Sequence, residues 1–165
     1  MSQYEVAEVY HSLRNTILSV TPEQLGLNRA TSEERLLGML MEIGYASATA
    51  TLMMAGDGAV SLYFSNGGGQ IGYGQYDAVR DTAADCLELA ESYKEEFELT
   101  EECPLPDPGH VRFYLLSFNG VLTAEAEGDE LGGGDHSLSP LFRAGHRVIT
   151  AMRMIQESQS EEEEE

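Results

Sequence analysis

Hydrophobic residues change their spacing several times along the chain, and each spacing predicts a kind of element. Over residues 3–20 they recur every three or four positions, which predicts an amphipathic helix. Thr21-Pro22-Glu23-Gln24 is typical of a capping box that opens a short helical turn. A second capping sequence at residues 31–34 predicts another helix that buries Leu36, Leu37, Leu40 and Met41 and ends at Gly44.

From Tyr45 the period becomes two, which is typical of strands. Residues 45–54 and 60–65 alternate in this way and are joined by Ala55-Gly56-Asp57-Gly58, which indicates a hairpin. A glycine-rich loop at residues 66–74 follows. Residues 76–98 then return to helical spacing, with an apolar stripe and a carboxylate stripe on one predicted helix.

The C-terminal third repeats the order of hairpin, glycine cluster and helix. Prolines at positions 104, 106 and 108 predict an extended loop, and Asn119-Gly120 predicts a hairpin between residues 111–118 and 121–126. Ser139-Pro140 opens a last helix that ends near Ile155. We expect one domain over residues 1–156, followed by a disordered acidic tail over 157–165.

These elements predict an α+β fold with two N-terminal helices, then hairpin, helix, hairpin, helix. The hairpins form a mainly antiparallel sheet that carries its helices on one face. Residues expected on the core face are Val60, Leu62, Phe64, Val111, Phe113 and Leu115. The repeated order, with Phe64–Gly67 partly echoed by Ser117–Gly120, leaves open whether the two hairpin-helix units are a duplication.

The net charge of the chain limits the classes of molecule that it can bind more than any motif does. Nine basic residues stand against twenty-nine acidic ones, for a formal net charge of −20. A field of that sign repels nucleic acids and anionic membranes and attracts cationic partners. The N-terminus lacks the pattern of a signal peptide, no segment has the length of a membrane span, and two cysteines make no disulfide framework. We expect a cytoplasmic protein.

The predicted helix over 76–98 carries the candidate partner-binding surface. Its carboxylates have few compensating cations, and like charges at this spacing each cost tenths of a kcal/mol, which a cationic partner would offset. Two tyrosines at the end of the glycine loop would add specific contacts. The candidate residues are Asp77, Asp81, Asp85, Glu88, Glu91, Glu95, Tyr73 and Tyr76. The alternative interpretation of the stripe is a solvated helix face.

Two other interpretations concern ligands and catalysis. Gly67-x-Gly69-x-x-Gly72 matches a dinucleotide-binding pattern by letter, but the following helix opens with Asp77, and a hairpin rather than a parallel βαβ unit precedes it. No cofactor and no metal is expected, since no set of ligands has the spacing of a metal site. A small hydrolase or transferase would draw on Asp135, His136, His146 and Cys103, and only if the fold brings them together.

The segment Leu62–Gly72 is similar to a stretch found in immunity proteins of bacterial polymorphic toxin systems. The resemblance covers about a tenth of the chain. It implies a small acidic α+β protein, without enzyme activity, that binds and neutralises a basic toxin domain. The alternative is an oligomeric scaffold or adaptor protein whose sheet edge pairs with a second copy.

Overall fold

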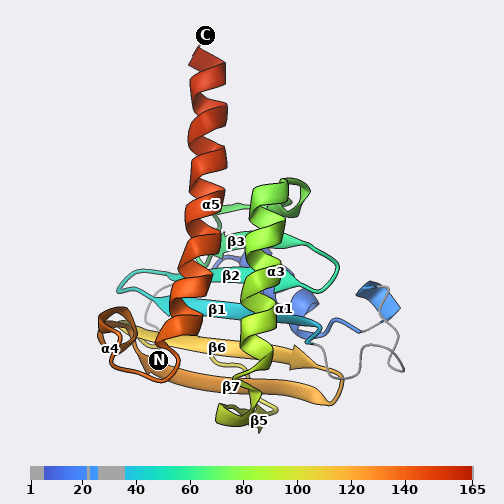
Figure 1. Ribbon diagram of the computed structural model, residues 1–165, viewed down its shortest axis with the longest axis vertical. Helices are drawn as coiled ribbons and strands as arrows, with labels where there is room; N and C mark the ends of the chain where they lie inside the picture. The colour runs from blue at the N-terminus through green and yellow to red at the C-terminus, as the bar shows by residue number, and fades with distance from the viewer. Residues whose placement is uncertain (1–5, 22, 26–35, 165) are drawn as a thin grey trace.

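A computed structural model describes residues 6–21, 23–25 and 36–164, with side chains to residue 159 (Figure 1). The described helical elements are α1 (Glu8–Leu18), η1 (Glu23–Leu25), η2 (Tyr73–Gln75), α3 (Asp77–Glu91), η3 (Lys94–Glu96), α4 (Gly128–Gly133) and α5 (Ser139–Glu164). The strands are β1 (Gly38–Gly44), β2 (Thr49–Ala55), β3 (Val60–Phe64), β4 (Gly69–Gln70), β5 (Glu98–Thr100), β6 (His110–Ser117) and β7 (Gly120–Glu127). The fold is α+β, as predicted.

The strands form one seven-stranded sheet in the order β4-β3-β2-β1-β6-β7-β5, and every neighbouring pair is antiparallel. Both predicted hairpins are present, as β2–β3 and β6–β7. The second hairpin turns through Phe118 and Asn119, and Gly120 already pairs with Ser117. Because the glycine-rich loop follows an antiparallel strand, it does not form the parallel βαβ unit that the dinucleotide pattern requires.

Helices cover both faces of the sheet, which corrects the prediction of a single covered face. α3 and α5 lie across one face and α1 lies behind the other (Figure 1). All six residues predicted for the core face pack on the α3–α5 side, with Phe64 only partly buried. The opposite cluster holds Tyr10 and Ile17 of α1 against Leu40, Met53 and Tyr114 of the sheet.

The prediction of a helix that ends at Gly44 is wrong over residues 38–44, because these residues form β1. The predicted start of that helix, at residues 31–34, lies outside the described residues. β1 is a central strand, paired with β2 on one side and β6 on the other. Met39 and Met41 face α3 and α5, while Leu40 faces α1. Since both faces of the strand are buried, its sequence is apolar apart from Glu42 and loses the alternation that identifies a half-exposed strand.

The structure also tests three predicted element boundaries. The Thr21 capping box is confirmed, because the Thr21 amide donates to the Gln24 side chain at 2.9 Å and the Gln24 amide donates to Thr21 Oγ1 at 3.3 Å. α3 ends at Glu91 rather than near Glu98, since the chain turns there to pair β5 with β7. α5 continues to Glu164, where we expected a disordered tail from residue 157; glutamate has a high helix propensity, and extending a formed helix is favourable.

None of the described helices has both the length and the apolar character needed to cross a bilayer.

Candidate functional site

The carboxylates predicted to bind a partner lie mostly on the outer surface of α3. Val79, Ala83, Cys86 and Ala90 form the buried side of this helix, which packs against the sheet and α5. The helical period therefore turns Asp77, Asp81, Asp85 and Glu88 to solvent. Packing of the apolar stripe holds these four side chains on a rigid element.

The charges on α3 differ in how they are compensated. Arg80 forms an ion pair with Asp77 and donates a 3.3 Å hydrogen bond to the carbonyl of Gly74. No ion pair with Asp81, Asp85 or Glu88 is formed by the described part of the chain. These three carboxylates, which we call the open acidic stripe, belong to solvent-exposed residues.

Glu91 and Glu95 do not belong to the open acidic stripe. Glu91 is half-buried, and its carboxylate accepts a 3.1 Å hydrogen bond from the Leu36 amide just before β1. Glu95 is exposed but lies on η3, after α3 has ended. The six predicted carboxylates therefore do not form one surface. Glu91 instead links α3 to the residue that precedes β1.

A hollow of about 360 Å³ borders the open acidic stripe at its C-terminal end. Leu36, Gly56, Ala84, Leu87, Glu88 and Glu91 line it. Apolar side chains and two carboxylates meet there. This combination suits the aliphatic stem and charged head of a lysine or arginine side chain.

Tyr73 and Tyr76 are half-buried rather than projecting from the glycine loop. Their ring centroids are 5.5 Å apart, and both rings pack against the core cluster on the α3–α5 face. The Tyr76 hydroxyl is hydrogen-bonded to Gln159 of α5. The two rings pack at the entry into α3, and their partial burial limits the surface that they offer to a partner.

The four residues considered for catalysis are not brought together. Cys103 packs against the cluster on the α1 face, whereas His146 lies on α5 on the other face, with its ring 4.4 Å from that of Phe142. His136 Nδ1 accepts a 3.0 Å hydrogen bond from the Leu138 amide, and Asp135 is exposed beside it. Burial raises the pKa of Cys103, and the charge of Arg14 opposes that effect.

Across the described ranges, no group of three or more His, Cys, Asp or Glu side chains is placed to hold a metal ion.

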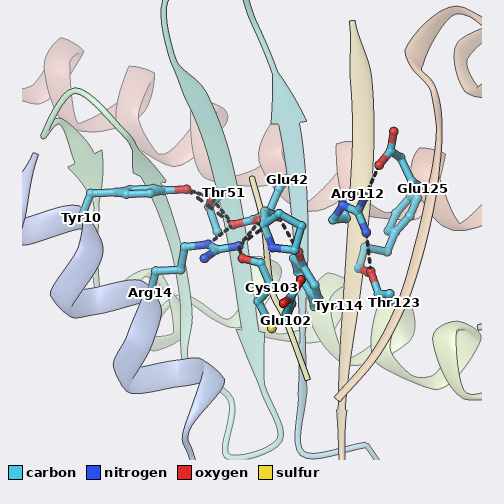
Figure 2. Close-up of polar contacts among 12 residues, drawn as sticks. Tyr10, Arg14, Glu42, Thr51, Glu102, Cys103, Arg112, Tyr114, Thr123 and Glu125 are labelled. Carbon is cyan, nitrogen blue, oxygen red and sulfur yellow. Dashed lines mark hydrogen bonds and ion pairs between the residues drawn. The ribbon is translucent and has the colours of Figure 1, made fainter. Parts of the chain in front are cut away.

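A buried polar network that we did not predict fastens α1 to the sheet (Figure 2). Arg14 donates from Nε and Nη2 to the two oxygens of Glu42, both at 2.8 Å. Thr51 Oγ1 donates to Glu42 at 2.7 Å, and Tyr10 is hydrogen-bonded to Thr51 at 2.6 Å. Glu42 is fully buried and Arg14 is 7% exposed. The network joins α1, β1 and β2.

Arg14 also holds the proline loop. Its Nη2 donates at 2.8 Å to the carbonyl of Cys103, its guanidinium lies 5.6 Å from the ring centre of Tyr114, and Tyr114 donates to the carbonyl of Pro104. Burial by itself lowers the pKa of Arg14, but the hydrogen bonds and charge of Glu42 outweigh it and raise the pKa. Burial and the Glu42 charge raise the pKa of Tyr114. Arg14 is therefore a fixed cation with a structural role.

The network extends along a row of residues paired across four strands of the sheet. Glu42 pairs with Thr51 of β2 and Arg112 of β6, and Arg112 pairs with Glu125 of β7. Arg112 forms an ion pair with Glu125, whose other oxygen lies 3.0 Å from His110 Nδ1. The charges alternate in sign along the row and compensate one another. The sequence does carry a signal for the Arg14–Glu42 pair. Arg14 is a lone arginine in the apolar stripe of the first helix, and Glu42 is a lone glutamate in an apolar strand.

No protein-family model, curated protein or solved structure matches this chain.

Proposed function

We propose that this chain is an acidic binding protein that captures and neutralises a basic partner protein. The observation that carries the proposal is the open acidic stripe, whose three carboxylates lie on a rigid helix and form no ion pair with the described residues. The hollow beside Glu88 and Glu91 supports it, because a cationic side chain would find both apolar surface and negative charge there. The net charge of −20 adds a long-range field of the same sign.

The mechanism of capture follows from the placement of these charges. Opposite charges steer two proteins toward each other and raise the association rate by about 10- to 1000-fold at low salt. Exposed charges contribute little to the final affinity, so apolar and backbone contacts must supply the rest. We therefore propose that the open acidic stripe sets the rate and orientation of binding.

The more specific form of the proposal is an immunity protein that blocks a bacterial toxin domain. It is supported by the resemblance of residues 62–72 and by the small acidic α+β fold. In the structure this segment comprises most of β3, the following turn and β4. It lies at the edge of the sheet, next to the start of α3.

The test of the proposal begins with capture of the partner from the native host and its identification. The purified partner is then titrated with the wild type and with the variant Asp81→Asn, Asp85→Asn, Glu88→Gln. We expect the variant to associate about 10-fold more slowly at low salt and to show a weaker salt dependence. Glu91 is left unchanged because it bonds to Leu36.

The matched control neutralises three exposed carboxylates outside α3, in the variant Glu8→Gln, Glu23→Gln, Glu101→Gln. Both variants lose three charges, so a loss of rate confined to the first locates the contact on α3. An acidic partner, or equal rates for the two variants, would show that the capture mechanism is wrong.

A further inference from the structure

The outer edge of β7 is only partly covered. On one side β7 pairs with β6 over its whole length, from Gly120 to Glu127. On the other side it pairs with β5 only at Val121, Leu122 and Thr123. Figure 1 shows β5 as a short strand beyond β7, with α4 near the other end of the sheet edge. Because β5 runs antiparallel to β7, the chain enters it past Ala124, through η3 and Phe97. Among the described residues, no strand pairs with residues 124–127 on their outer side.

Along β7, the backbone N–H and C=O groups of successive residues point alternately toward β6 and toward the outer edge. This alternation identifies the groups that no described strand pairs with. Ser117 and Gly120 close a two-residue hairpin, so Gly120 and every second residue after it bond to β6. The backbone groups of Val121 and Thr123 point the other way, toward β5. Glu125 and Glu127 share that direction, and within the described residues no backbone bond to another element covers them. Such an edge is a template for an added strand.

A hollow of about 270 Å³ lies beside this open edge, with Glu96, Glu98, Glu125, His136 and Leu138 in its lining. Three of its lining residues are glutamates, and no lysine or arginine belongs to the lining. The carboxylate of Glu125 is already paired with Arg112, but those of Glu96 and Glu98 belong to exposed residues. The hollow favours a cationic occupant.

We propose that residues 124–127 bind an extended, lysine- or arginine-bearing segment of the partner, which adds a strand to the outer side of β7 beyond Phe97. Backbone hydrogen bonds to Glu125 and Glu127 would provide affinity, and alternate side chains would reach the carboxylates of the hollow. The expected charge of the occupant rests on the proposed function. A second copy of this chain is disfavoured, because pairing of two β7 edges would place Glu125 and Glu127 of each copy against one another.

The probe for this site is the blocked peptide acetyl-Lys-Val-Lys-Val-Lys-Val-amide, titrated into the isotope-labelled full chain and followed by amide NMR. We expect shifts concentrated at residues 121–127 and slower hydrogen exchange at the Glu125 and Glu127 amides. The same peptide with N-methyl groups on alternate residues keeps its charge but cannot pair, and we expect it to lose these effects. Shifts confined to α3, equal effects of both peptides, or no shifts at all would each overturn the edge site.

A pair of substitutions at Glu127 separates the backbone donor from the charge. Glu127 has φ −73°, which proline adopts without strain, so Glu127→Pro removes the outward N–H while leaving the β6 ladder intact. Glu127→Gln removes the charge and keeps the N–H. We expect Glu127→Pro to weaken peptide binding by about 5- to 10-fold and Glu127→Gln by about 2-fold. Equal binding by the two variants would contradict the proposed strand pairing.

The edge site and the proposed function fail separately. Neutralisation of the open acidic stripe tests association with the whole partner, whereas the Glu127 pair tests backbone pairing on another element. If Glu127→Pro binds the peptide as the wild type does while the stripe variant still slows association, the edge site is wrong and the proposed function stands.

Discussion

Arg14 of α1 and Glu42 of β1, 28 positions apart in the sequence, form a bidentate ion pair in the interior of the protein. Each charge satisfies the other, and Thr51 and the carbonyl of Cys103 complete their hydrogen bonding. Burying either charge alone would be costly, because the interior solvates ions poorly. The pair therefore specifies where α1 sits on the sheet.

Removal of one member of this pair is expected to destabilise the protein strongly. Glu42→Ala leaves the Arg14 guanidinium buried without its partner, and we expect the free energy of unfolding to fall by about 3–5 kcal/mol. Urea unfolding followed by circular dichroism measures this change. The control is the double variant Arg14→Met, Glu42→Leu, which removes both charges and is expected to recover most of the loss. A loss below about 1 kcal/mol in Glu42→Ala would contradict the structural role.

A side chain at Gly44 is expected to destabilise the protein, because the proline loop passes directly over this position. A Cβ atom at this position would lie 2.2 Å from the carbonyl oxygen of Asp107, and Gly44 also accepts a 2.9 Å hydrogen bond from the Gly109 amide. Since backbone atoms must move to make room, we expect Gly44→Ala to cost about 1–3 kcal/mol of unfolding free energy. Thermal and urea unfolding provide the measurement.

The matched control for Gly44 is Gly132→Ala on α4. Apart from its chain neighbours and the backbone of α4 itself, no atom lies within 4 Å of a Cβ built there, so we expect a change near zero or a gain of up to about 1 kcal/mol from helix propensity. Equal effects of the two substitutions would rule out the close approach of the loop as the cause.

His146 is expected to make the protein less stable as the pH falls below the ordinary range of histidine. Burial lowers the pKa of His146 from the ordinary value of 6.5. The unfolded chain therefore binds the proton more tightly than the folded protein does, so folding stability falls as the pH drops through and below 6.5. Other groups titrate in the same range, so the quantity of interest is the difference between the wild type and His146→Gln.

Urea midpoints at pH 7.5 and pH 5.5 measure this difference. We expect the midpoint of the wild type to fall more between the two pH values than that of His146→Gln. The exposed His11 offers the control variant His11→Gln, which should keep the pH dependence of the wild type. The prediction fails if the wild type and His146→Gln lose stability equally.

The candidate site could be predicted in part. The period of 3.6 residues placed Asp81, Asp85 and Glu88 on the outer side of a helix, and the structure agrees. It could not show that Glu91 bonds to Leu36, because that contact joins residues 55 positions apart. The open edge of β7 was equally hidden, since it depends on where β5 stops pairing.

By itself the sequence determined the elements with a clear local pattern. These are the first helix, the hairpins β2–β3 and β6–β7, the carboxylate-bearing α3 and the start of α5, where spacing, caps and turn residues act over a few positions. The tertiary structure alone decided the rest. The apolar run Leu36–Met41 is compatible with a helix or a buried strand, and pairing with β2 and β6 makes it β1. Contacts between distant segments also decide that helices cover both sheet faces and that Arg14 pairs with Glu42. Such contacts leave no periodic signal in the chain, so the pattern of the sequence could not predict them.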